Sequence, residues 1–77
     1  MTGTRLKLLR KKKNLTQIQV QMKTGIDQSD YSKLERGSRY PTVEQAKRLA
    51  LLYNTSLDYI FCLTDEEKPY PQKKETI

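Results

Sequence analysis

The 77-residue sequence has no histidine, no tryptophan and a single cysteine, Cys62. Without histidine it has neither an imidazole base nor a histidine ligand for a metal. One thiol can neither close a disulfide within the chain nor hold zinc alone, which fits a reducing cytoplasm. The sequence also lacks a nucleophile–base constellation and a glycine-rich phosphate loop. We therefore expect no enzymatic activity, no metal, no cofactor and a cytoplasmic location.

Long apolar runs are missing as well. The longest, 49–53, is far shorter than the roughly 18 residues of a membrane span. Near the N-terminus, Lys7 interrupts the apolar residues and RKKK follows at 10–13, so we expect no signal peptide. Too few apolar residues oppose these lysines for a basic membrane-binding helix. The sequence therefore predicts no membrane partner.

The net charge of +6 is concentrated in the first half of the chain. Residues 1–13 carry six cations and no acid, whereas residues 64–77 carry three cations and four acids. Such an excess suits a surface that faces a polyanion, although small domains are also basic for solubility alone. The lysines at 11–13 suit a helix C-terminus better than a phosphate strip, because they cross several helix faces.

Helix start and stop signals recur along the chain. The starts are residues whose side-chain oxygen can accept an orphan backbone N–H. They are Thr16 with Gln19, Asp27 with Asp30, Thr42 with Gln45, Ser56, and more weakly Thr4. The stops, which tolerate left-handed backbone geometry, are Asn14, Gly25, Gly37 and Asn54. Together with the apolar spacing, these signals predict helices over about 4–13, 16–24, 27–36, 42–53 and 56–62.

These helices predict one compact, all-α domain over residues 1–62, since 77 residues leave no room for a second domain. Residues 63–77 contain two prolines, mixed charge and little apolar content, which is typical of an extended or disordered tail. Alternatively, the tail is an arm that pairs with a second subunit, with Leu63 and Tyr70 as its main apolar contacts.

The second and third expected helices are separated by only three residues, 25–27, including a glycine. Such a turn is typical of a helix-turn-helix, whose second helix can enter the major groove of DNA. At about 100° per residue, Tyr31 and Leu34 mark the buried side of the helix at 27–36. The opposite arc contains no acid and consists of Gln28, Ser29, Ser32, Lys33 and Arg36. Asp30 lies at the edge of this arc, where it could repel a phosphate.

The central sequence resembles the DNA-binding domain of the Cro- and phage-repressor-like (XRE-type) regulators. The matching motifs are LTQ at 15–17, G-I-x-x-S-x-Y-S-K-L-E-R-G at 25–37, RYPT at 39–42 and NTSLDYIF at 54–61. The resemblance covers about residues 5–62. It implies a helix-turn-helix fold and sequence-specific binding to double-stranded DNA.

The resemblance also implies roles for individual residues. The implied base-edge contacts are Gln28, Ser29 and Lys33, with Ser32 beside them. The implied phosphate contacts are Gln17, Arg36, Arg39 and the backbone near Ser38, while Tyr40 is open between a phosphate contact and packing. Arg10 and Glu35 match an ion pair that joins the first helix to the third. Gln21 departs from the family, which usually has a small residue there. We expect a slightly opened angle between the two helices, or a Gln21 side chain that reaches solvent.

We therefore expect a transcriptional regulator, in particular a repressor, that acts as a homodimer on a palindromic operator. Gln28 suits adenine, Lys33 suits guanine and Ser29 can serve either. The expected dimer surface is the fifth helix with the tail, where Leu51, Tyr59 and Cys62 leave apolar area. No small-molecule ligand is expected. The alternatives are a protein-interaction module (an antirepressor or antitoxin) with the same fold, and the controller protein of a restriction system or mobile element.

Overall fold

The computed structural model describes residues 4–71, which form five helices and, within that range, no strand. The helices are α1 (Leu6–Lys12), α2 (Gln17–Thr24), α3 (Gln28–Arg36), α4 (Val43–Tyr53) and α5 (Leu57–Ile60). The expected all-α class is confirmed. Each helix begins one or two residues later than expected, because the capping residue lies just outside it. None of these helices is long and apolar enough to cross a membrane.

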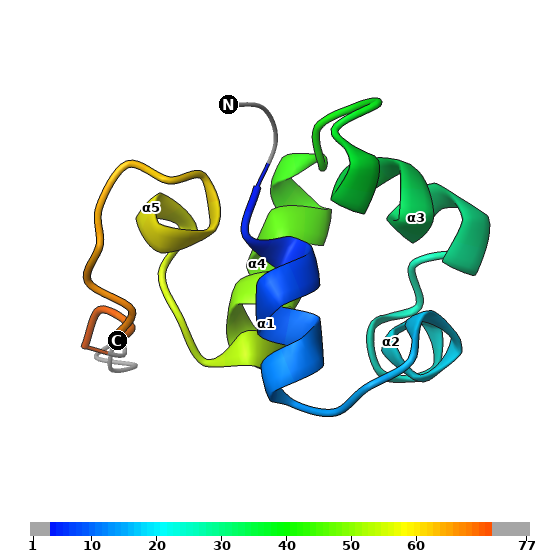
Figure 1. The fold of residues 1–77 in the computed structure, drawn as a ribbon, viewed down its shortest axis with the longest axis horizontal. Coiled ribbons are helices and arrows are strands. Elements are labelled where there is room, and N and C mark those ends of the chain that lie inside the picture. The colour runs from blue at the N-terminus through cyan, green and yellow to red at the C-terminus, as the bar shows by residue number, and fades with distance from the viewer. Residues whose placement is uncertain (1–3, 72–77) are drawn as a thin grey trace, which may run out of the picture.

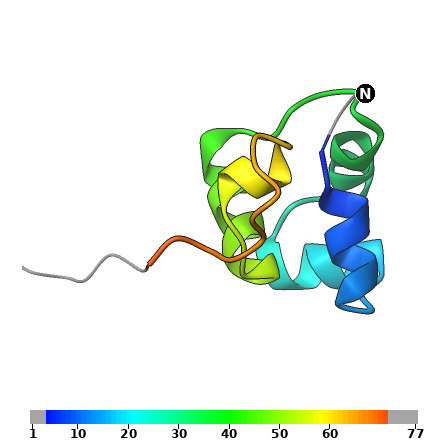
Figure 2. The same ribbon diagram turned by 60° about the vertical axis from the view of Figure 1, so that its left-hand side comes forward.

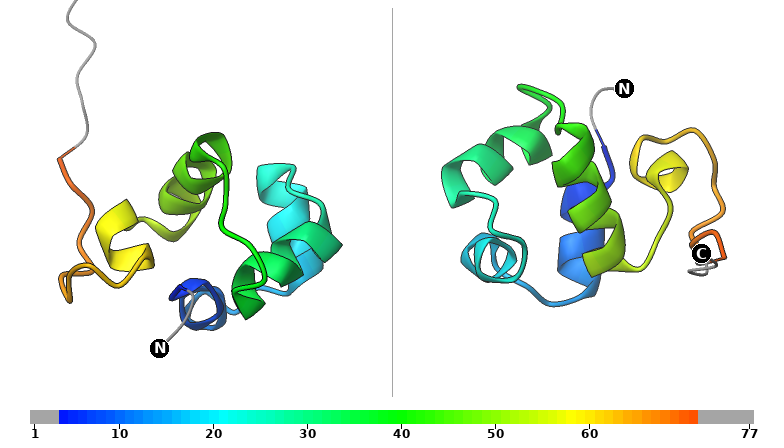
Figure 3. Two further views of the ribbon diagram at one scale, coloured as in Figure 1. Left: turned by 90° about the horizontal axis from the view of Figure 1, so that it is seen from above. Right: turned by 180° about the vertical axis from the view of Figure 1, so that it is seen from behind.

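The helices surround a single core (Figure 1 and, from above and behind, Figure 3). In Figure 1, α1 and α4 lie in the middle, with α2 and α3 on one side and α5 with the following chain on the other. The main packing contacts join α2 to α3 and α4, α4 to α5, and α1 to α3. This arrangement leaves α3 at the edge of the domain with one of its sides uncovered.

Every helix contributes to the core, and so does the turn between α2 and α3. The buried cluster consists of Leu6, Leu9, Val20, Ile26, Tyr31, Leu34, Leu49, Tyr53 and Ile60. Fully burying one such side chain stabilises the fold by about 1.5–3 kcal/mol relative to leaving it exposed. Because Ile26 belongs to the turn, the core fixes the turn as well as the two helices that flank it.

Residues 63–71 have no helix or strand, but hydrogen bonds and ion pairs tie them to the domain. Arg5 donates to the carbonyl of Thr64 (2.6 Å), and Thr55 donates to that of Glu67 (2.6 Å). The Glu67 carboxylate also pairs with Lys12 (2.7 Å). In Figure 2 this segment, drawn in orange, continues the chain after α5 and runs past that helix. The expected extended or disordered tail therefore stays a prediction, and its residues 72–77 lie outside the described part.

Two buried tyrosines meet at the centre of the core. The hydroxyls of Tyr31 and Tyr53 are 2.6 Å apart and hydrogen-bonded, and neither side chain is more than 2% exposed. Burial raises the pKa of both phenols, that of Tyr53 to about 12. The core therefore contains a polar pair whose ionisation is unfavourable in the fold.

We predict that this pair makes the fold sensitive to alkaline pH. An unfolded tyrosine ionises near pH 10, whereas Tyr53 in the fold keeps its proton to about pH 12. The unfolded state therefore binds fewer protons above about pH 10, and stability falls as the pH rises, by up to ~1.4 kcal/mol per pH unit for each tyrosine. Urea unfolding at about pH 8 and about pH 11 measures the loss. A Tyr31→Phe/Tyr53→Phe variant should lose less stability over this interval, and an equal loss would contradict the assignment.

Candidate nucleic-acid interface

Both ends of α3 are set by local hydrogen bonds. At its start, the Asp27 carboxylate accepts from the backbone N–H of Ser29 (3.1 Å) and from the Ser29 hydroxyl (2.6 Å). The Ser29 hydroxyl holds the pKa of Asp27 below its usual value. At the end of α3, Gly37 adopts a left-handed φ of 77°, which a residue with a Cβ rarely adopts. Asp30, which was paired with Asp27 in the expected start signal, takes no part in this cap, because its carboxylate pairs with Arg39 instead.

The side of α3 away from Tyr31 and Leu34 carries the residues expected to contact DNA. Ser29, Lys33 and Arg36 are exposed, and Gln28 and Ser32 are half-buried. Arg36 donates to the hydroxyl of Ser32 one turn earlier (2.6 Å). The structure therefore places the four expected base-contacting residues and Arg36 on one accessible side of one helix.

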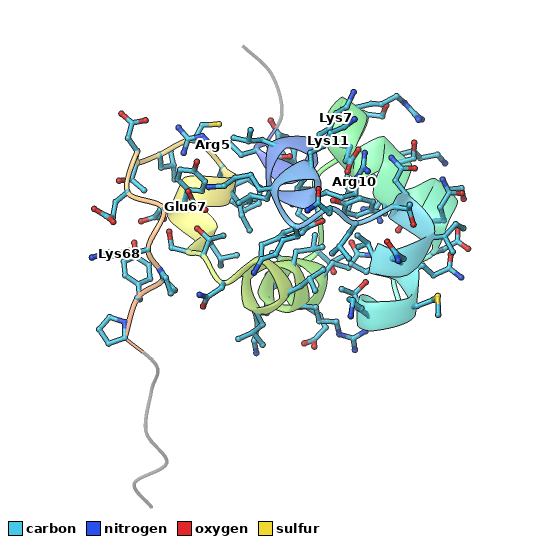
Figure 4. All side chains as sticks on the ribbon, turned by 60° about the horizontal axis from the view of Figure 1, so that its bottom comes forward. Arg5, Lys7, Arg10, Lys11, Glu67 and Lys68 are labelled. Carbon is cyan, nitrogen blue, oxygen red and sulfur yellow. The ribbon has the colours of Figure 1, made fainter. Side chains whose placement is uncertain are left out.

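Glu35 joins α3 to α1 through the expected ion pair with Arg10. Arg10 Nε lies 2.6 Å from Glu35 Oε2, with the Arg10 side chain 13% exposed and that of Glu35 only 4%. Arg10 also donates to the carbonyl of Leu15 (2.9 Å). Figure 4 shows Arg10 reaching from α1 toward α2 and α3. Burial alone would raise the pKa of Glu35, but hydrogen bonds from Arg10 and Gln17 outweigh it and hold that pKa below its usual value.

Two glutamines extend this ion pair to the exposed side of α3. Gln17 Nε2 donates to Glu35 Oε1 (3.0 Å), and Gln28 Nε2 donates to Gln17 Oε1 (2.7 Å). An amide nitrogen has two hydrogens, so Gln28 keeps a second donor beside its side-chain carbonyl. One donor next to one acceptor is the pattern that adenine matches in the major groove. Gln28 therefore keeps the donor and the acceptor that the expected adenine contact needs.

Arg39 braces the loop after α3. It donates to both carboxylate oxygens of Asp30, one at 2.8 Å, and to the side-chain carbonyl of Gln45 (3.2 Å). It also donates through Nη1 to the carbonyl of Tyr40 (2.9 Å). The Arg39 guanidinium holds the pKa of Asp30 below its usual value. The negative charge expected to repel a phosphate is thus matched by a neighbouring cation.

Ser38 and Tyr40 continue this loop. The backbone N–H of Ser38 donates to the carbonyl of Lys33 (2.9 Å) at the end of α3, and Ser38 itself is exposed, so the phosphate contact expected from the backbone near Ser38 stays a prediction. The Tyr40 ring lies 6.2 Å from that of Phe61 between ring centroids and is 65% exposed as a residue. Tyr40 therefore packs on α5's end while remaining accessible, and its phosphate contact stays a prediction.

Gln21 takes a route that neither expectation described. It is half-buried, and its side-chain carbonyl accepts from the backbone N–H of Gln28 (2.7 Å). The expected path to solvent is wrong, and the expected opening of the angle between α2 and α3 stays a prediction. The turn is held further by Thr24, whose hydroxyl accepts from Ile26 N–H (3.2 Å) and whose carbonyl accepts from Arg48 (3.0 Å). The only sequence signal for the Gln21 contact is its position one turn after Gln17 on the same helix.

The fold and this exposed helix agree with the comparison of the sequence with known families. A sequence model described as Helix-turn-helix matches residues 6–60, a range that includes all five helices. The chain belongs to the helix-turn-helix family of DNA-binding transcriptional regulators, as the resemblance to Cro- and phage-repressor-like regulators indicated.

Three curated relatives carry the same description. An uncharacterized HTH-type transcriptional regulator of Bacillus subtilis, YobD, is 41% identical over 91% of this chain and 62% of its own length. Another, y4dJ of Sinorhizobium fredii, is 38% identical over 86% of each chain. A third, from Archaeoglobus fulgidus, is 31% identical over 83% of this chain and 90% of its own. The chain thus spans less than two thirds of the Bacillus relative. No solved structure matches the present chain.

We predict that breaking the buried Arg10–Glu35 pair costs far more stability than breaking an exposed pair. Glu35→Met removes the carboxylate and strands Arg10, so it should cost about 3–5 kcal/mol of unfolding free energy. Glu44→Met is the matched control, since Glu44 pairs with Arg48 one turn away with side chains 63% and 50% exposed. It should cost less than about 0.5 kcal/mol. Equal costs in urea unfolding would show that the buried pair does not hold α3.

Proposed function

We propose that the chain represses transcription by binding a palindromic operator as a homodimer, with α3 in the major groove of each half-site. The observation that carries the proposal is the exposed polar side of α3. Its orientation is held by the hydrogen bonds that lead from Arg10 through Glu35 and Gln17 to Gln28. A regulator that occupies a promoter in this way blocks access to it. Two-fold symmetry of the protein would be matched by half-sites about one helical turn apart.

In this proposal, base recognition comes from Gln28, Ser29, Ser32 and Lys33. Gln28 offers its free amide hydrogen and its carbonyl to an adenine, and Lys33 offers its ammonium group to the O6 and N7 acceptors of a guanine. The Ser29 hydroxyl donates to Asp27 and so presents its lone pairs outward as an acceptor. Ser32 lies one turn after Gln28 and gives a second hydroxyl on the same side.

In this proposal, phosphate contacts hold α3 in the major groove. Arg36 is exposed at the end of the helix, and Gln17 keeps one amide hydrogen beyond its bond to Glu35. Arg39 keeps one Nη1 hydrogen beside its bonds to Asp30, Gln45 and Tyr40, and the hydroxyls of Ser38 and Tyr40 lie on the same loop. These groups position the protein and carry no sequence information directly. A dimer making roughly 6–10 such contacts should lose about 10³–10⁵ in affinity between about 50 and 200 mM salt.

We predict different outcomes for the two kinds of contact on a duplex selected by the wild-type chain. Lys33→Ala should cost about 1–3 kcal/mol of binding free energy and relax the preference at one base position. Arg36→Ala should weaken binding about equally on all sequences and reduce the salt slope of the dimer by about two, since each copy loses one phosphate contact. Fluorescence titrations against single-base variants of the duplex measure both. If Lys33→Ala left affinity and preference unchanged, the proposed reading side of α3 would be wrong.

The proposed dimer surface lies away from α3. A groove of about 260 Å³ runs between the end of α4, the start of α5 and residues 69–71. Its apolar lining includes Leu51 and Tyr70, which are 68% and 60% exposed. Figure 1 places α5 and the following chain on the side opposite α3, so a second copy covering this groove would leave α3 free. Tyr59 contributes less than expected, because the Arg5 guanidinium lies over its ring at 4.1 Å.

We predict that a charge in this groove separates the two copies. Leu51→Lys should yield a monomer, since a lysine at the centre of an isologous contact faces its own symmetry mate. Val43→Lys is the control, because Val43 is 77% exposed on the same helix but does not line the groove. Sedimentation of both variants and the wild type gives the oligomeric state. If Leu51→Lys sedimented as the wild-type dimer does, the groove would not be the dimer surface.

A further inference from the structure

Two glutamines one turn apart on α2 hold the two ends of Gln28. Gln17 Oε1 accepts from the side-chain amide of Gln28 (2.7 Å), and Gln21 Oε1 accepts from its backbone N–H (2.7 Å). Gln17 and Gln21 lie on the same side of α2, which packs against α3. A side chain expected to contact a base is therefore fixed at its root and at its tip.

The contact at the root satisfies a donor that the helix itself cannot satisfy. The first N–H groups of an α-helix have no partner within the helix. The cap residue Asp27 accepts from the N–H of Ser29, and Gln21 accepts from the N–H before it, that of Gln28. Gln21 is half-buried, and its side-chain carbonyl lies 2.7 Å from the Gln28 backbone nitrogen. The first turn of α3 is thus fastened to α2 by a side chain.

Other contacts hold the turn between α2 and α3 but act before Gln28. Gly25 adopts a left-handed φ of 79°, and Thr24 accepts from Ile26 and Arg48. These contacts fix the path of the turn. The Gln21 contact acts on the backbone of residue 28 itself. In the proposed complex the side chain of that residue enters the major groove of DNA.

We propose that Gln21 is a positioning residue that sharpens base recognition by fixing the backbone of Gln28. The inference rests on the proposed function, because it assumes that Gln28 contacts a base. A bidentate contact requires the donor and the acceptor of Gln28 to reach two atoms of one base at once. A backbone that shifts at the start of α3 moves both groups together and lowers the discrimination between bases. Fixing that backbone removes the shift before DNA is bound.

Two variants of similar length test the proposal. Gln21→Met keeps an unbranched side chain but removes the acceptor, whereas Gln21→Glu keeps a carboxylate oxygen in its place. The base position read by Gln28 is identified first, as the position at which Gln28→Ala loses its preference. Gln21→Met should lower the preference at that position by a factor of about 2–10, the effect of one hydrogen bond. Gln21→Glu should retain it, and the position affected by Lys33→Ala should keep its preference in both variants.

A second measurement needs no DNA. Hydrogen exchange of the Gln28 backbone amide should be faster in Gln21→Met than in the wild type and in Gln21→Glu. The positioning role would be overturned if Gln21→Met kept the full preference at the Gln28 position, or lost preference equally at every position. The proposed function would still stand in that case, because the wild-type chain would keep its own sequence preference. If the wild-type chain itself enriched no sequence, the proposed function would fail, and this inference would fall with it.

Discussion

The orientation of α3 depends on one buried carboxylate, that of Glu35. It accepts hydrogen bonds from Arg10 on α1 and from Gln17 on α2 while belonging to α3 itself, so a single group joins three helices. Burying a carboxylate is costly unless it is paired and hydrogen-bonded. Here both conditions are met, and any rotation of α3 that broke them would leave a charge stranded at 4% side-chain exposure. Gln17 carries the same constraint outward to Gln28.

The carboxylates around α3 explain how an acid-containing helix can face a polyanion. Asp27 is committed to the start of the helix, Asp30 to Arg39 and Glu35 to Arg10. Each has a donor of the chain itself as its partner. The side left over presents amides and hydroxyls, with the charges of Lys33 and Arg36. The proposal that the chain binds a palindrome as a dimeric repressor rests on this side of α3.

The sequence predicted what depends on neighbouring residues and missed what depends on tertiary contacts. Thr16 and Thr42 mark helix starts because a cap is completed within three residues, and both capping boxes are present. The buried faces followed from spacing alone. The Arg10–Glu35 pair spans 25 residues and was expected only through the family resemblance. Three features had no such guide, because in each of them the two partners become neighbours only after folding. They are the Gln21 contact with the backbone of Gln28, the Asp30–Arg39 pair and the docking of residues 63–71.

The most direct test of the central claim is selection by the wild-type chain from a library of random DNA duplexes. A dimer that places one α3 helix in each of two major grooves should enrich a palindrome whose half-sites are centred about 10 base pairs apart. Its affinity for the enriched duplex should be higher at low salt than at high salt. Recovery of sequences without a common motif would contradict the account. It would instead favour a protein-interaction module, in which the helix-turn-helix fold serves a protein partner.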